Sequence, residues 1–495
     1  MVDYKSVLSL IGSILVWLSV PLLLPLFIAI FSGEDIFAFV ATIVLVVVTG
    51  LILERFEKEP DIGTREGFLL VMLTWLVMAI FGALPYIFAG QGSVASPINA
   101  FFESMSGFTT TGATVMEEIS FARHSAAIMM WRQLSQWLGG MGIIVLAVAI
   151  LPKLSIGGIQ LIEAEAPGPS VERLAPRMVE TARRLWLVYV GLTVLMVAIL
   201  YVLHLNGQAP GMYFYNALAH AFTTLPTGGF STEAAGVAAF SPAAQWTIIP
   251  FMFLAGTNFA LLWWVFSGHF SILRENKEFL LYLAIVLLAG LMIFLGLLVT
   301  VDYDQLEAWR HSFFQTLTII TTTGYASADF AGWSGIMLTV LFLLMFVGGC
   351  AGSTGGGIKI VRWLVGIKSI VRQLFTTIHP DAVRPLRRGK KVVSEDIVQN
   401  IIIMILTYFS IFLVGTLFLQ LDALRVGVEF EPLELMSASA ASLGNIGPGM
   451  GAFGPMENYL VLSPVSRLIC AVLMWLGRLE IFTVLIVFTP AYWKR

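Results

Sequence analysis

Threonine and glycine recur in one short pattern at four places along this chain. Residues 101–112 read FFESMSGFTTTG, and residues 313–324 read FFQTLTIITTTG in the same register without a gap. Looser copies end at residues 227–230 and 445–448, and the copies lie in strongly apolar surroundings. Rings of backbone carbonyl oxygens can replace the water around a monovalent cation, so a repeated Thr-Gly stretch at membrane depth favours an ion path.

One such copy could be an ordinary turn between two membrane spans. Four copies on the same expected side of the membrane, each after a half-length helix, weigh against that interpretation. Glycine adopts backbone conformations closed to other residues and lets neighbouring strands approach closely. Carbonyl rings also supply dipoles without a fixed charge that would trap the ion.

Composition indicates a membrane protein. Of the 495 residues, 58% are hydrophobic and 12% are charged, whereas a soluble domain carries about 25% charged residues. The net charge of −3 gives no reason to expect nucleic acid as a partner. The two cysteines lie in apolar stretches and the six histidines never fall at metal-ligand spacing, so neither a disulfide framework nor a cofactor is predicted.

The apolar segments predict an all-α polytopic membrane protein. A helix of about 20 apolar residues crosses the hydrocarbon core, and the run from Val7 to Phe31 is too long for a cleavable signal peptide. The first two segments form a hairpin, and the rest form four pairs that each enclose one Thr-Gly copy. The candidate segments are 8–32, 36–54, 68–90, 126–151, 184–204, 243–267, 279–301, 334–375, 396–420 and 465–489.

We therefore expect an N-terminal two-helix hairpin and four helix–pore-loop–helix repeats around a central pore. The predicted divisions are 1–60 for the hairpin, 61–160 for repeat one, 161–275 for repeat two with a cytoplasmic linker at 152–183, 276–380 for repeat three with a broken second helix, and 381–495 for repeat four.

A short helix is predicted before each Thr-Gly copy. Ser96 is a natural N-cap and Pro97 fits the first helical position, and Glu431-Pro432 repeats that start signal before the fourth copy. Twelve residues from Pro97 to Phe108 make a helix of about 18 Å, which reaches only halfway across the membrane. The chain must then return in extended form, which is tolerated where it lines a cavity. The negative C-terminal ends of four such helices favour a cation between them.

Positive charges predict the orientation. With the N-terminus in the cytoplasm, four of the 28 Lys and Arg residues are external and two lie within spans, which leaves 22 on or near the inner side. The external four are Arg123, Arg310, Arg425 and Arg467, and the other two are Arg132 and Arg478. Acidic outer loops would concentrate cations at the mouth; they carry Glu117, Glu118, Glu233, Asp302, Asp304, Glu307, Asp329, Glu429, Glu431 and Glu434.

With these motifs and this organisation, the chain resembles the TrkH-type potassium uptake proteins of the Trk/Ktr/HKT superfamily over almost its whole length, the extra N-terminal hairpin included. The resemblance implies a K+ selectivity filter made of Thr110, Thr111, Gly112, Thr227, Gly228, Gly229, Thr322, Thr323, Gly324, Asn445, Ile446 and Gly447. Tyr325 gives only repeat three a Thr-Gly-Tyr ending, and Ala113, Phe230 and Pro448 depart from it. Glycine at all four final positions favours potassium, because related plant proteins with serine there transport sodium.

The overlong eighth segment is broken by a glycine-rich stretch. Its small and polar residues are Gly348, Gly349, Gly352, Ser353, Thr354, Gly355, Gly356 and Gly357. A phosphate-binding P-loop is disfavoured because Ile358 precedes Lys359 and no Ser or Thr follows the lysine. Close helix packing through small residues is one interpretation. The resemblance implies another, a flexible intramembrane gate below the filter.

Two arginines lie within predicted spans, where charge is costly and marks functional candidates. Arg478 could pair with Glu480, with Glu103 or with loop carbonyls; the resemblance implies that it lies beneath the filter as a barrier to cations. Arg132 has Gln133, Gln136 and Trp137 around it, which favours a packed polar seam with a structural role.

The resemblance also implies partners and a location. We expect K+ uptake driven by the membrane potential in a bacterial inner membrane, by a homodimer with one pore per chain. The basic inner segments 153–184 and 359–395 would dock a TrkA-like cytosolic ring of nucleotide-binding regulatory subunits, or would act only as topology signals beside anionic lipid. The alternative function is an H+- or Na+-coupled cation symporter. An enzyme is not expected, because no nucleophile, metal or acid–base set is clustered.

Overall fold

Helices build almost the whole molecule. A computed structural model of the chain describes residues 2–57, 63–145, 174–382, 384–388 and 391–494. Within these ranges the strands are one short antiparallel pair, β1 (Arg387–Arg388) and β2 (Lys391–Val392). Among the described residues, six helices are long and apolar enough to cross a membrane, or up to eight if each bent pair is one span. The predicted all-α membrane architecture is confirmed, and the chain is an integral membrane protein.

The helices follow the predicted order. The hairpin region holds α1 (Tyr4–Leu18), α2 (Leu23–Ser32) and α3 (Ile36–Glu54). The next helices are α4 (Thr64–Gly82), α5 (Leu84–Ala89), α6 (Pro97–Phe108) and α7 (Ala126–Val145), and then α9 (Leu174–Leu205), α10 (Phe214–Thr224), α11 (Pro242–Ala255) and α12 (Phe259–Phe266). The last are α13 (Ser271–Glu275), α14 (Lys277–Thr300), α15 (Gln305–Ile320), α16 (Gly335–Leu344), α17 (Ile360–Ile378), α18 (Glu395–Val426), α19 (Pro432–Gly444), α20 (Pro464–Arg478), α21 (Phe482–Leu485) and α22 (Pro490–Trp493).

Short 3-10 turns join several of these helices, at Ser93–Ala95, Gly236–Ala239, Phe330–Gly332, Gly451–Phe453, Tyr459–Val461 and Ile486–Phe488. The predicted boundary between repeats one and two and most of the linker 152–183 lie outside the described residues, as does Lys390 of the basic segment.

Four half-length helices precede the Thr-Gly copies. Helix α6 has the predicted bounds, with Pro97 at its first position. Helix α19 begins at Pro432, where Glu431 and Glu434 form a reciprocal capping box. Together with α10 and α15, these helices contain 11 to 16 residues, so each is about 17–24 Å long. None can cross the roughly 30 Å hydrocarbon core.

Two segments that we expected to be continuous spans are bent. Segment 243–267 turns by 107° between α11 and α12, and segment 465–489 turns by 104° after α20. At the first bend the Asn258 side chain accepts a hydrogen bond from the backbone N–H of Leu261 and starts a new helix. At the second, Glu480 and Ile481 have positive φ of 60° and 54°, which a right-handed helix cannot accommodate, so α20 ends there. The break between α16 and α17 is as predicted.

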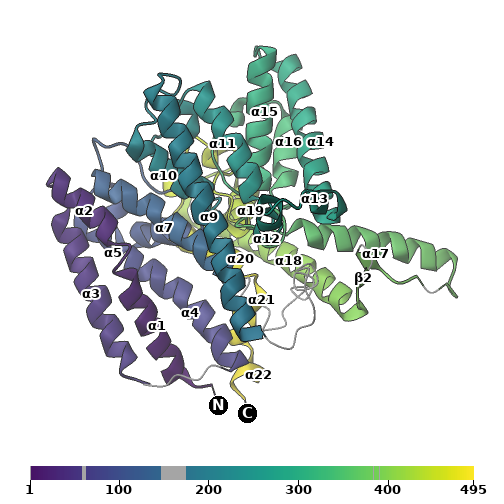
Figure 1. Cartoon of the computed structure of the whole chain (residues 1–495), viewed down its shortest axis with the longest axis horizontal. Coiled ribbons are helices and arrows are strands. Elements are labelled where there is room, and N and C mark those ends of the chain that lie inside the picture. Colours follow the sequence, from purple (N-terminus) through teal and green to yellow (C-terminus); the bar gives the residue numbers. More distant parts are fainter. Residues whose placement is uncertain (1, 58–62, 146–173, 383, 389–390, 495) are drawn as a thin grey trace.

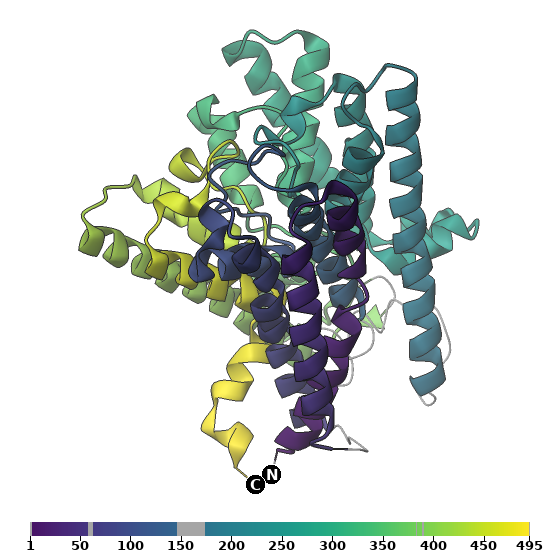
Figure 2. The same ribbon diagram turned by 90° about the vertical axis from the view of Figure 1, so that its left-hand side faces the viewer.

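The N-terminal hairpin packs along one side of the molecule. Helices α1 and α3 lie side by side in both ribbon views (Figures 1 and 2). A Cβ atom on Gly12 would lie 2.6 Å from the carbonyl oxygen of Gly50, so the two backbones are in direct contact. Both chain termini lie at the same end of the molecule, at the bottom of Figure 1.

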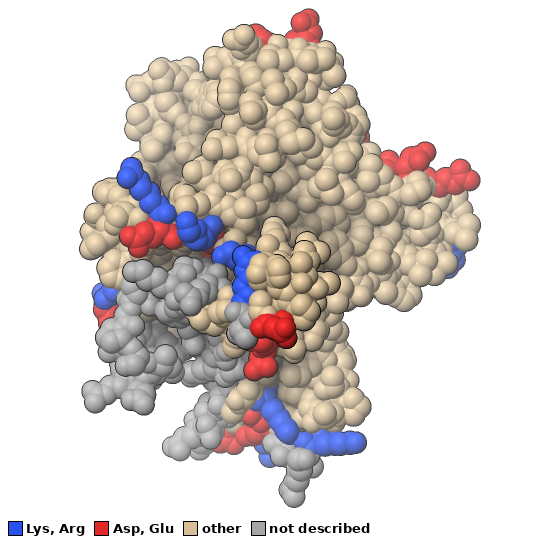
Figure 3. All heavy atoms as spheres, turned by 90° about the vertical axis from the view of Figure 1, so that its right-hand side faces the viewer, with Lys and Arg blue, Asp and Glu red and all other residues tan. Residues whose placement is uncertain are grey.

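The distribution of apolar and charged side chains on the surface is that of a protein embedded in a bilayer. Large apolar side chains are exposed on the outward faces of the long helices, including Trp17, Phe31, Leu288 and Val299, which is expected of side chains that face lipid. On the face in Figure 3, acidic side chains mark the upper end, and basic side chains gather lower down with acidic ones among them.

Candidate functional site

The four Thr-Gly strands share one backbone conformation. Each has a residue with φ between 53° and 60° two positions before its final glycine, and the glycine has φ between 78° and 100°. A left-handed residue other than glycine is uncommon, so its recurrence at one position in four strands indicates a common structural role. The pairs are Thr110 and Gly112, Thr227 and Gly229, Thr322 and Gly324, and Asn445 and Gly447.

The strands close into a ring. A Cβ atom added to any final glycine would approach the carbonyl oxygen of a neighbouring strand more closely than the 3.0 Å that real Cβ atoms keep. For Gly447 that oxygen belongs to Thr111, at 2.6 Å, and this contact joins the fourth strand back to the first. The other contacts are Gly112 to Gly228, Gly229 to Thr323, and Gly324 to Ile446. Glycine is therefore required at each position by both conformation and space.

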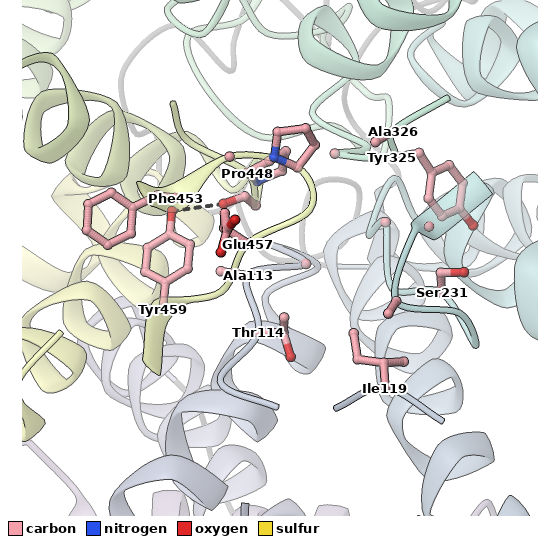
Figure 4. A pocket seen from close by; sticks show the side chains of 18 of the residues that line it. Ala113, Thr114, Ile119, Ser231, Tyr325, Ala326, Pro448, Phe453, Glu457 and Tyr459 are labelled. Carbon is pink, nitrogen blue, oxygen red and sulfur yellow. Dashed lines mark hydrogen bonds between the residues drawn. The ribbon is translucent and has the colours of Figure 1, made fainter. Parts of the chain in front are cut away.

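One pocket opens onto this ring. All four final glycines line it, and Figure 4 shows the residues Ala113, Tyr325 and Pro448 that follow three of them. The carboxylate residues Glu233 and Glu457 line it as well, so acidic groups lie near the ring on this side. Tyr325 follows the third glycine, and its hydroxyl lies 3.2 Å from the Thr224 hydroxyl and donates to the His220 carbonyl at 3.1 Å. The third strand is thus anchored to the second pore helix.

Side-chain hydroxyls tie the strands to the pore helices. The Thr109 and Thr111 hydroxyls are 2.8 Å apart, and those of Thr321 and Thr323 are 2.7 Å apart. Asn445 occupies the fourth strand, and its amide donates to the Thr111 hydroxyl at 3.0 Å and to the Met474 carbonyl at 2.9 Å. The Thr110 hydroxyl and the Asn445 Oδ1 have no hydrogen-bond partner among the described residues, so these two side-chain oxygens remain available beside the backbone carbonyls.

The glycine-rich loop, Gly348–Gly357, lies against the C-terminal ends of three pore helices. The Thr354 hydroxyl donates to the carbonyl of Leu225, which follows α10, at 2.8 Å. The backbone N–H of Gly356 donates to the Thr322 hydroxyl at 2.7 Å, and its Cα faces the Gly444 carbonyl at the end of α19. The loop therefore lies directly beneath the ring, on the side opposite the pocket.

Arg478 holds this loop. The arginine is buried at the end of α20, and its Nη1 donates to the Thr354 carbonyl at 2.9 Å. Its Nε and Nη2 atoms have no hydrogen-bond partner among the described residues. Lys359 adds a second cation, because its Nζ donates to the Gly355 carbonyl. Two positive side chains thus contact the loop next to the ring.

Two of the sequence interpretations of Arg478 are wrong. Glu480 forms its ion pair with Arg362, and Glu103 forms its ion pair with Arg132 at 2.7 Å. The contact of Arg478 with a loop carbonyl is the alternative that is observed. Each of these two glutamates therefore pairs with an arginine other than Arg478.

The contacts of three residues with the site were not predicted from the sequence. Asn258 caps α12 and donates to the Ala351 carbonyl of the loop at 2.6 Å. Glu103 and Gln136 are fully buried next to the first and second strands. The sequence did indicate that these residues have buried partners, because a carboxylate in a pore helix and amides within apolar spans must be hydrogen-bonded. Their partners depend on the fold.

Fold and site together define an integral membrane protein whose four half-length helices each deliver one strand to a shared ring. The family model described as TrkH, a cation transport protein, matches residues 33–495. A potassium uptake protein TrkH from Halomonas elongata is 38% identical over 507 residues, covering 99% of each chain, and one from Escherichia coli is 35% identical over 502 residues, covering 99% of this chain and all of that one. The crystal structure of the potassium transporter TrkH from Vibrio parahaemolyticus superposes with a TM-score of 0.88 at 33% identity, covering 99% of this chain and 100% of the other.

The chain belongs to the TrkH family of cation transport proteins. The resemblance predicted from the Thr-Gly copies and the hairpin is confirmed.

Proposed function

We propose that this chain takes K+ into the cell through the ring of four Thr-Gly strands. The observation that carries the proposal is the closed set of contacts that runs from Gly112 round to Gly447 and back to Thr111. Potassium is supported by the names of the relatives, which are potassium uptake proteins, and by glycine at all four final positions. Cation transport is not an enzyme class.

In this proposal the ion sheds water and is held by carbonyl oxygens of the strands. The oxygens come from Thr110–Gly112, Thr227–Gly229, Thr322–Gly324 and Asn445–Gly447. The left-handed residues and the close contacts between strands support this role, because they fix carbonyl groups without placing a formal charge in the ring. The C-terminal ends of the pore helices add favourable partial negative charge.

The loop Gly348–Gly357 is the proposed gate, and Arg478 the proposed barrier. The contacts of Thr354 and Gly356 with pore-helix ends support a closed position of the loop beneath the ring. The hydrogen bond from Arg478 to the Thr354 carbonyl supports a latch. A cation that leaves the ring on this side would meet both the loop and the positive side chains.

The larger arrangement is also a proposal. We propose five parts: a hairpin, residues 1–60, and four pore repeats, residues 61–160, 161–275, 276–380 and 381–495. The N-terminus lies in the cytoplasm, the chain in the inner membrane of a bacterium, and two copies form a dimer. The basic inner face docks a cytosolic ring of nucleotide-binding subunits. The distribution of basic residues supports the orientation. The exposed apolar side chains Ile370, Leu374 and Ile378 on α17 support an additional protein contact.

The test is ion flux into liposomes that contain the purified protein, with K+, Rb+ and Na+ compared. We expect the native chain to pass K+ and Rb+ well above Na+, and Gly447→Ser to raise Na+ relative to K+, because a side chain there collides with the Thr111 carbonyl. Gly427→Ser is the matched control, since Gly427 has φ of 76° and no atom near its Cβ position. Equal loss of all ions, with their ratio unchanged, would contradict the filter assignment.

A further inference from the structure

Helix α7 presents a row of polar side chains to the back of the second strand. Arg132 and Gln136, one helical turn apart, are both buried. The helix lies close to the pore loops because glycines permit it: a Cβ atom on Gly140 would lie 2.7 Å from the Cα of Pro226, which precedes the strand. The two polar residues thus lie against the strand Thr227–Ser231.

Gln136 holds the second strand at two points. Its Nε2 donates to the Gly228 carbonyl at 2.7 Å, and its Oε1 accepts from the backbone N–H of Phe230 at 3.1 Å. The two bonds fix which end of the amide is oxygen, since a flipped amide would set oxygen against oxygen. A Cβ atom on Gly228 would lie 2.9 Å from Nε2 and closer still to Cδ, so glycine is required to admit the glutamine.

The hydrogen bond from Gln136 to the Gly228 carbonyl distinguishes the second strand from the other three. In each strand one carbonyl oxygen faces the final glycine of a neighbouring strand. These carbonyls belong to Thr111, Gly228, Thr323 and Ile446. Among the described residues, a hydrogen bond is found only to the one from Gly228. That strand also has two adjacent glycines, Gly228 and Gly229, which have the greatest conformational freedom of any residue. The strand with the least intrinsic stiffness is thus held by a side chain at its inter-strand carbonyl, whereas in the fourth strand the Tyr459 hydroxyl donates to the carbonyl of the final glycine, Gly447, at 2.9 Å.

Arg132 extends the restraint to the end of the strand. Its Nη1 donates to the Ser231 carbonyl at 2.9 Å, and its guanidinium lies 3.6 Å from the centre of the Phe230 ring. Its Nε is paired with Glu103, whose Oε2 accepts a hydrogen bond at 2.9 Å from the backbone N–H of Val115, in the segment that follows the first strand. The ion pair therefore joins the segments that follow the first and second glycines.

We propose that Gln136 and Arg132 are positioning residues that set the ion selectivity of the ring by fixing the second strand, with Glu103 as the counter-ion. The inference rests on the proposed function. With Gln136 in place, the Gly228 carbonyl is shared between the ring and the amide and cannot follow a smaller ion inward. Without the amide, the carbonyl is free to move, and discrimination against Na+ falls.

The experiment compares Gln136→Met with Gln133→Met in liposomes. Gln133 is equally buried on the same helix, but its amide has no hydrogen-bond partner among the described residues. We expect Gln136→Met to lower the K+/Na+ flux ratio by roughly threefold to tenfold, the change that corresponds to one hydrogen bond. Gln133→Met retains the native ratio. An unchanged ratio in Gln136→Met, or an equal fall in both variants, overturns the proposal.

A second variant guards against loss of folding. Gln136→Glu keeps the acceptor for the Phe230 N–H and removes the donor to Gly228, so it also lowers the ratio. If neither Gln136 variant folds while Gln133→Met does, the amide supports the fold rather than selectivity, and the proposal is overturned. The proposed function is tested separately from the role of Gln136. If the native protein passes no K+, the proposed function is contradicted, whatever the results for the variants.

Discussion

At the scale of single residues, the fourth strand shows how an asparagine can replace a threonine without disturbing the ring. Asn445 has φ of 54°, close to the φ of the threonines at the same position. Asparagine tolerates the left-handed region better than most residues. Its amide then bonds to Thr111 of the first strand and to Met474 of α20. The residue closes the ring through its side chain as well as its backbone.

Asn445→Gly tests that role of the side chain. Glycine retains access to the left-handed conformation, so the variant removes the two hydrogen bonds without adding backbone strain. We expect a loss of about 1–3 kcal/mol in stability, at 0.5–1.5 kcal/mol per bond, and a lower K+/Na+ ratio. Thermal unfolding in detergent and liposome flux measure the two effects. A variant with native stability and native ratio would show that the amide does not hold the strands together.

Arg478→Ala tests the latch. A hydrogen bond from a charged donor contributes about 1.5–3 kcal/mol, so its loss is expected to raise K+ flux by roughly tenfold or more. Arg478→Lys keeps the charge and one donor and is expected to stay nearer to native flux. Initial rates of Rb+ uptake into liposomes measure the change. Native-like conduction in Arg478→Ala would remove the barrier role.

At the scale of elements, the glycine-rich loop interrupts the membrane helix between Leu344 and Ile360 with a segment that follows the pore-helix ends. Non-helical backbone at this depth needs polar partners from the protein. The loop finds them in Gly256, whose carbonyl accepts from the Cys350 N–H at 2.8 Å, and in Asn258 and Thr322. The bend after α11 supplies two of these partners, so the bend and the loop form one unit.

Shortening this loop tests the gate. Deletion of Ser353, Thr354 and Gly355 removes the contacts with Leu225 and Arg478, and a loop without them cannot cover the pore-helix ends. We expect higher K+ flux with little change in the K+/Na+ ratio, because the strands are untouched. Flux and size-exclusion profiles are measured on the same preparation. Unchanged or reduced flux in a monodisperse protein would count against gating.

The elements also show how far the sequence alone could lead. The bounds of α6 followed from Pro97 at its start and the Thr-Gly copy at its end, and the break between α16 and α17 followed from its glycines. The bends at Asn258 and Glu480 were missed because the few polar residues at each bend leave the whole segment apolar enough to pass for one span. The pairing of Glu103 with Arg132 could not be read either, since several arginines were available and only packing selects one.

At the scale of the whole molecule, the positions of charges predict one orientation in the membrane. Gly207 follows α9 and Gly268 follows α12, and both have positive φ, exposed surroundings and no atom near the Cβ position. Both natural cysteines are buried. A cysteine at either glycine is therefore a clean reporter of its side of the membrane.

We expect a membrane-impermeant maleimide to label Gly207→Cys in intact cells and to leave Gly268→Cys unlabelled until the membrane is opened. The physical reason is the excess of Lys and Arg on the side that carries Gly268. The unsubstituted chain serves as the background control. Labelling of Gly268→Cys alone in intact cells would reverse the proposed topology.

The proposed function requires four strands of one chain to hold a dehydrated cation between their carbonyl oxygens. The most direct measurement is anomalous diffraction from crystals soaked in Rb+ in place of K+. The account predicts a peak within the ring, in contact with backbone oxygens of all four strands that end at Gly112, Gly229, Gly324 and Gly447. An empty ring in a well-ordered crystal, or a peak bound by side-chain carboxylates elsewhere, would contradict it.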